Sequence, residues 1–111
     1  MTAFSLQGQT ALVTGGSRGI GAAIAKTLAT AGATVLINYR SNKEAAEKIL
    51  AEIQKISPKS ELLPFDISNE TEVENALGEV SKRFPQIDIL VCNAGISKDV
   101  LFPRATGDVF H

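Results

Sequence analysis

A glycine-rich stretch near the amino terminus has the residue types and the spacing of a phosphate-binding turn. Residues 10–21, TALVTGGSRGIG, begin with an apolar, β-branched segment, continue through the glycines and lead into the alanine-rich sequence of 22–29. The first turn of a helix presents unpaired backbone N–H groups and the positive end of the helix dipole, and both attract a phosphate. Glycine also permits positive φ and the close approach of a ligand. The stretch therefore predicts a pyrophosphate site; the alternative is a strand-to-helix turn that holds no ligand.

Distinctive residues also follow three later apolar segments of the chain, 34–39, 61–65 and 87–92. The carboxyl ends of parallel strands meet at one edge of a sheet, and open α/β sheets bind their ligands outside that edge. We therefore expect four turns to converge on one nucleotide. Their residues are Gly15, Ser17, Arg18, Gly19, Ile20 and Gly21 in the first turn, Arg40 and Ser41 in the second, Asp66 and Ile67 in the third, and Asn93, Ala94 and Gly95 in the fourth.

Helical patterns separate the apolar segments. The helix that follows the glycine stretch carries Ile20, Ile24 and Leu28 on one face. A second helix is expected to begin at a capping box in which Ser41 is the cap, and to stop at 57–58, Ser-Pro. Either Ser68 or Asn69 can cap a third helix. The buried face of this third helix is predicted to consist of Val73, Ala76, Leu77, Val80 and Phe84.

The alternation of strand and helix patterns predicts the fold class. It favours an α/β protein with a parallel sheet covered by helices. Right-handed crossovers then give the strand order 3-2-1-4, which is the first half of a doubly wound, Rossmann-like sheet. Pro64 in segment 61–65 cannot donate a backbone hydrogen bond, so this strand should lie at the edge of the sheet.

Composition excludes several classes of function. The 111 residues suit a single domain, and a net charge of −1 offers no basic surface for nucleic acid or an anionic membrane. No segment has the length of a membrane span, and residues 1–9 lack the pattern of a signal peptide. The single cysteine excludes an internal disulfide and a cysteine-based zinc cluster, so we expect a protein of the reducing cytoplasm. No metal-binding residue is predicted.

The motifs together resemble those of a known family. The string Thr14–Gly21 is similar to the T-G-x-x-x-G-I-G signature of the short-chain dehydrogenase/reductase family, and Asp66, Asp88 and 93–95 match further motif positions in the family's order. The similarity covers essentially the whole chain, and residues 94–101 look most like the 3-oxoacyl-acyl-carrier-protein reductases. Cys92 departs from the family pattern, which usually has Asn there; we expect a small, buried side chain at the end of its strand.

The resemblance implies a role for each turn. Asp66 would face the adenine, with Ile67 packed beside it, and Thr14 would tie the glycine turn to the fourth turn through its hydroxyl. The alternatives are that Asp66 only shapes the approach to a helix and that 93–95 is a plain turn. By the same resemblance the cofactor pyrophosphate would be held by Gly15, Ser17, Gly19, Ile20 and Gly21, and its ribose and nicotinamide by Asn93, Ala94 and Gly95.

Charge at the second turn indicates which dinucleotide is bound. An NAD site places Asp or Glu at the end of the second strand to hold the ribose 2′-hydroxyl, but residues 34–43 contain no acid. Arg40 stands there instead, and Arg18 lies in the glycine stretch; an arginine suits a 2′-phosphate. The sequence therefore predicts NADP(H), and the alternative is that both arginines are solvated surface charges.

No catalytic residue is predicted within the chain. Tyr39 and Lys43 have the Y-x-x-x-K spacing of the family's catalytic pair, but they lie on the adenosine side, so we reject them. His111 is expected to be a surface residue and Cys92 a structural one. By resemblance, the reaction is hydride transfer assisted by Tyr, Lys and Ser residues that would follow position 111.

These observations predict that 1–111 is the cofactor-binding part of one Rossmann domain that is apparently truncated. The resemblance implies a homotetrameric NADP(H)-dependent enzyme that reduces a 3-oxoacyl thioester on an acyl-carrier protein. Two alternatives remain open: another short-chain sugar or alcohol dehydrogenase, and a non-catalytic nucleotide-binding module that ends naturally at His111.

Overall fold

A four-stranded parallel sheet forms the centre of the computed structural model, which describes residues 5–15 and 19–93. The strands are β1 (Thr10–Thr14), β2 (Thr34–Tyr39), β3 (Glu61–Pro64) and β4 (Ile89–Cys92). The helices are α1 (Gly19–Thr30), α2 (Lys43–Gln54) and α3 (Glu70–Val80). Strands and helices alternate along the described chain, which confirms the predicted α/β class.

The strands lie in the order β3-β2-β1-β4, as predicted for the first half of a Rossmann-like sheet. β1 pairs in parallel with both β2 and β4, so Leu12 faces Leu36 on one side and Leu90 on the other. The chain moves from β1 outwards to β3 and then crosses to β4, which makes the β1–β4 boundary the switch point of the sheet. Pro64 is exposed on the edge strand β3, in agreement with its missing N–H group.

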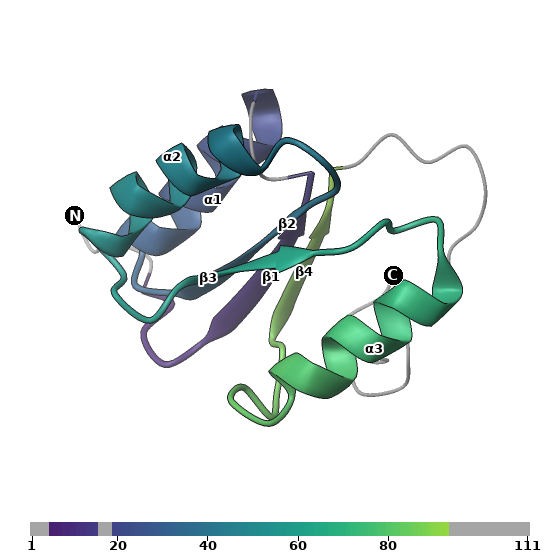
Figure 1. The fold of residues 1–111 in the computed structure, drawn as a ribbon. Helices are drawn as coiled ribbons and strands as arrows, with labels where there is room; N and C mark the ends of the chain where they lie inside the picture. The colour runs from purple at the N-terminus through teal and green to yellow at the C-terminus, as the bar shows by residue number, and fades with distance from the viewer. Residues whose placement is uncertain (1–4, 16–18, 94–111) are drawn as a thin grey trace.

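Helices cover both faces of the sheet, α1 and α2 one face and α3 the other (Figure 1). Successive residues of a strand point to opposite faces, so each strand supplies both cores. The core under α1 and α2 includes Ala11, Val13, Val35, Ile37, Ala25, Ala29 and Ile53. The core under α3 includes Leu12, Leu36, Leu63, Val73, Leu77 and Val80. Burial on both faces explains why the central strands are apolar almost throughout.

Helix α1 packs with a face that differs in part from the one predicted. Its buried residues are Gly21, Ala22, Ala25 and Ala29. Ile20 is 72% exposed, whereas the prediction placed Ile20, Ile24 and Leu28 on the apolar face. Leu28 is partly buried and packs on the core as predicted, and Ile24 is half-buried. The fully buried positions are held by alanine and glycine, whose small side chains let the helix backbone approach the sheet closely.

The helix ends differ from the prediction in detail. Asn42, rather than Ser41, caps α2, since its side-chain oxygen accepts a hydrogen bond from the Ala45 N–H at 3.1 Å. Asn69, one of the two predicted candidates, caps α3 in the same way through the N–H of Glu72. α3 ends at Val80, and Phe84 packs on the core from the segment that follows.

Candidate functional site

The glycine turn and the Asn93 turn are joined at the switch point. The Thr14 hydroxyl accepts a hydrogen bond from the backbone N–H of Asn93 at 2.9 Å and donates to the carbonyl of Val91 at 3.3 Å. The side-chain amide of Asn93 donates to the carbonyl oxygen of Gly15 at 3.3 Å. The predicted tie through Thr14 is therefore present, and it joins the carboxyl ends of β1 and β4.

The first turn of α1 packs directly against this junction. A Cβ atom added to Gly21 would lie 2.7 Å from the side-chain nitrogen of Asn93 and closer still to the backbone oxygen of Gly15. Position 21 therefore requires glycine. Gly15 has a φ of 64°, in the left-handed region, which turns the chain away from β1. The amino end of α1 is thus held over the carboxyl ends of β1 and β4.

The remaining residues of the predicted pyrophosphate site are described only in part. Gly19 is the first residue of α1 and is exposed, as is Ile20 beside it. Ser17 and Arg18 lie outside the described residues, as do Ala94 and Gly95 of the fourth turn.

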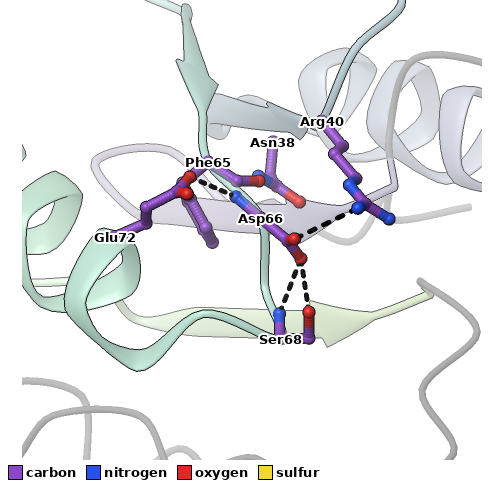
Figure 2. A network of polar contacts seen from close by, with 6 residues as sticks. All are labelled: Asn38, Arg40, Phe65, Asp66, Ser68 and Glu72. Carbon is purple, nitrogen blue, oxygen red and sulfur yellow. Dashed lines mark hydrogen bonds and ion pairs between the residues drawn. The ribbon is translucent and has the colours of Figure 1, made fainter.

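Asp66 follows β3 and is the centre of a polar network (Figure 2). One carboxylate oxygen, Oδ1, accepts hydrogen bonds from the hydroxyl of Ser68 at 2.7 Å and from its backbone N–H at 2.9 Å. The N–H of Asp66 itself donates to the carboxylate of Glu72 at 2.9 Å. The bonds from Ser68, aided by the charge of Arg40, lower the pKa of Asp66. Asp66 is therefore a carboxylate with a fixed orientation, and it also shapes the turn that leads to α3.

Arg40 and Asp66 connect the ends of β2 and β3. A guanidinium nitrogen of Arg40 lies 3.4 Å from the second carboxylate oxygen of Asp66, Oδ2 (Figure 2). The Arg40 side chain is 76% exposed, so the pair is open to solvent and contributes little to stability. Two residues predicted to hold the adenosine end of a dinucleotide are thus adjacent, and most of the guanidinium remains accessible to a ligand.

The other predicted site residues of these turns have simpler surroundings. Ser41 is exposed between β2 and α2. Ile67 is partly buried against the core under α3. Asp88 lies at the amino ends of the strands, away from the proposed site. Its carboxylate accepts a hydrogen bond from the N–H of Thr10 at 2.9 Å and so joins the start of β4 to β1.

One residue at the carboxyl ends of the strands was not identified from the sequence. Asn38 lies on β2, is only 3% exposed and hydrogen-bonds to the backbone of Gly15 and of Phe65. Its signal was an amide inside an otherwise apolar strand. A buried amide is costly in a parallel strand unless it forms hydrogen bonds with neighbouring segments, so its presence indicates such partners.

The environment of Cys92 differs from the prediction. It was expected to be a buried side chain, but it is exposed, because β4 has no neighbour on its outer side within the described part of the chain. Partial desolvation raises the pKa of the thiol, which disfavours the thiolate that a nucleophile needs. Tyr39 is buried, whereas Lys43 is exposed at the start of α2.

Within residues 5–15 and 19–93, no group of three or more His, Cys, Asp or Glu side chains is arranged to hold a metal ion. Among the helices of those same ranges, none combines the length and the apolar character needed to cross a bilayer.

Comparison with known proteins gives the family. The family model for short chain dehydrogenases matches residues 9–111. The chain is 42% identical over 96 residues to a 3-oxoacyl-acyl-carrier-protein reductase of Staphylococcus epidermidis, and the match covers 86% of this chain and 39% of that protein. This chain belongs to the short-chain dehydrogenase family, whose members are oxidoreductases that bind nicotinamide dinucleotides.

Solved structures agree with this assignment. A short chain dehydrogenase from Burkholderia cenocepacia in complex with NADP is 47% identical, with a TM-score of 0.76 over 84% of this chain and 38% of that one. A 2-keto-3-deoxy-D-gluconate dehydrogenase from Streptococcus agalactiae is 38% identical, with a TM-score of 0.73 over 86% of this chain and 36% of that one. The chain therefore spans less than half the length of each of these relatives.

Proposed function

We propose that this chain is the cofactor-binding part of an NADP(H)-dependent short-chain reductase. The observation that carries the proposal is the junction of Thr14, Gly15 and Asn93 beneath the first turn of α1. A Cβ at Gly21 would fill the space in which that turn meets the junction. The backbone N–H groups of this turn can hold the two phosphates of a dinucleotide at the switch point of the sheet.

The proposed contacts follow the chain from turn to turn. Asp66 accepts a hydrogen bond from the exocyclic amino group of adenine through Oδ2, because Oδ1 already accepts two hydrogen bonds from Ser68. Oδ2 is shared with the exposed guanidinium of Arg40, which lies 3.4 Å away. Ile67 packs beside the ring. The pyrophosphate lies on Gly15, Ser17, Gly19, Ile20 and Gly21, and the ribose and nicotinamide lie over Asn93, Ala94 and Gly95. The nicotinamide, when bound, supplies or accepts the hydride.

The preference for NADP(H) is proposed from charge. The end of β2 carries Arg40 and Ser41 where an NAD site would have an acid, and the Arg40 side chain is 76% exposed. Arg18 can approach the same 2′-phosphate from the glycine turn. The NADP complex of the Burkholderia cenocepacia relative supports this choice.

The proposed reaction of the whole protein is the reduction of a 3-oxoacyl thioester on an acyl-carrier protein, by a cytoplasmic homotetramer. The Staphylococcus epidermidis relative supports this substrate class. A short-chain sugar dehydrogenase is the second candidate, favoured by the similarity to the Streptococcus agalactiae enzyme. A nucleotide-binding module without catalytic activity is the third.

Calorimetric titration of the chain with NADPH and with NADH tests the proposed cofactor. We expect both to bind and NADPH to bind more tightly. Tighter binding of NADH would contradict the proposed cofactor preference, and the absence of binding by either would contradict the proposed site. The chain alone should not oxidise NADPH in the presence of a 3-oxoacyl thioester, because no catalytic residue is assigned within it.

A further inference from the structure

The side-chain amide of Asn38 connects two of the turns proposed to hold the nucleotide. Its oxygen accepts a hydrogen bond from the backbone N–H of Gly15 at 3.4 Å. Its nitrogen donates to the carbonyl of Phe65 at 3.0 Å, one residue before Asp66, and to the carbonyl of Leu63 at 3.1 Å. Asn38 therefore contacts the glycine turn with one end of the amide and the Asp66 turn with the other. Figure 2 shows Asn38 beside Phe65 and Asp66.

The chemistry of these contacts requires both halves of an amide. An N–H group must meet an acceptor and a carbonyl must meet a donor, and asparagine offers both at this length of side chain. A carboxylate would satisfy Gly15 but would oppose the two carbonyl oxygens of Leu63 and Phe65. Asn38 is 3% exposed, so water does not readily replace a missing partner.

We propose that Asn38 is a positioning residue, which fixes the glycine turn and the Asp66 turn relative to one another so that one dinucleotide can span both. This inference rests on the proposed function. β2 lies between β1 and β3 in the sheet, so the amide reaches both turns from the strand that separates them. A change at Asn38 moves the pyrophosphate and adenine contacts apart while each turn stays otherwise intact.

Ser60 provides a matched control for the effect of a lost buried hydrogen bond on stability. It is 1% exposed, accepts the N–H of Val35 at 2.9 Å and contacts the hydroxyl of Ser57 at 3.1 Å. Because Ser60 directly precedes β3, it lies at the amino ends of the strands, whereas the proposed site lies at their carboxyl ends. Ser60→Ala should therefore reduce stability without changing nucleotide binding.

The first experiment measures NADPH affinity by titration, in conditions where thermal unfolding shows every variant to be folded. We expect Asn38→Ala to raise the Kd about tenfold and Asn38→Asp to raise it at least as much, whereas Ser60→Ala leaves it unchanged. A wild-type Kd for Asn38→Ala, or an equal loss for Ser60→Ala, would overturn the proposal.

The second experiment needs no nucleotide and separates this inference from the proposed function. Amide hydrogen exchange and chemical shifts of the unliganded chain should change at Gly15 and at Asp66 in Asn38→Ala. In Asn38→Asp they should change mainly at Asp66, because the acceptor for Gly15 remains. Unaltered amides at both turns would refute the positioning role, whereas failure of the wild-type chain to bind NADPH or NADH would refute the proposed function alone.

Discussion

The backbone N–H of Asn93 donates a 2.9 Å hydrogen bond to the side-chain hydroxyl of Thr14, across 79 positions of the chain. The bond joins the ends of the two strands that flank the switch point of the sheet. Thr14 is fully buried, so the partner that it provides is not easily replaced by water. The glycine turn and the Asn93 turn therefore keep their relative position before any ligand arrives.

Replacement of Thr14 by valine tests this bond. Valine has a similar shape but no hydroxyl, so the N–H of Asn93 loses its acceptor, and we expect the free energy of unfolding to fall by about 1–3 kcal/mol. Urea denaturation measures the change. Thr14→Ser is the control, because it keeps the hydroxyl and should retain more of the stability. The prediction fails if Thr14→Val is as stable as the wild-type protein.

Gly21 and Gly78 should respond in opposite directions to alanine. A Cβ at Gly21 collides with the backbone of Gly15 and the amide of Asn93, which cannot yield without moving the junction, so Gly21→Ala should destabilise the fold and abolish nucleotide binding. Gly78 on α3 has open space around it, so Gly78→Ala should stabilise the protein by about 0.5–1 kcal/mol. Thermal unfolding of both variants tests the prediction. Equal changes in the unfolding temperature of Gly21→Ala and Gly78→Ala would contradict it.

Arg40 should control the choice between the two dinucleotides. We expect Arg40→Ala to raise the Kd for NADPH about tenfold and to leave the Kd for NADH nearly unchanged, since only NADPH carries the 2′-phosphate. Arg83 serves as the control, because it is also exposed and paired with a carboxylate, that of Glu61 at 2.8 Å, away from the site. Equal losses for both dinucleotides in Arg40→Ala would contradict the assignment.

The titration of Asp66 should follow from its contacts. Hydrogen bonds from Ser68 lower its pKa below the ordinary value of 3.8, so the carboxylate form is favoured in the folded protein. The resulting stability is present above that ordinary value and is lost as pH falls through the lower pKa of the folded state. Ser68→Ala should raise the pKa of Asp66, measured by NMR titration of its carboxyl group, and should destabilise the protein less in strongly acidic solution than at neutral pH. An unchanged pKa in this variant would show that the Ser68 hydroxyl is not the cause, since the backbone N–H of residue 68 still donates to Asp66.

The topology was predictable because few arrangements satisfy the pattern of this chain. Four apolar segments separated by amphipathic helices favour a parallel sheet, and the handedness of crossovers then limits the strand order. Pro64, which cannot donate a backbone hydrogen bond, indicated that β3 is the edge strand. The Thr14 tie was expected from the resemblance, and the hydrogen bond from Asn93 confirms it.

Other features depend on contacts between distant segments. Periodicity placed Ile20 on a buried face of α1, but glycine and alanine packed there instead, because close approach of the backbones matters more than side-chain size. The partners of Asn38 and the pairing of Arg40 with Asp66 become visible only when β1, β2 and β3 lie side by side. The exposure of Cys92 likewise depends on the neighbours of β4 and not on its own sequence.

A titration of the isotope-labelled chain with NADPH, followed through the backbone amide shifts, tests the shared nucleotide site most directly. We predict saturable shifts at all four turns together, at Gly19, Arg40, Asp66 and Asn93, with none at Ser60 on the opposite edge of the sheet. Shifts confined to one turn, shifts at the opposite edge, or none at saturating NADPH would contradict a single site built from the four turns.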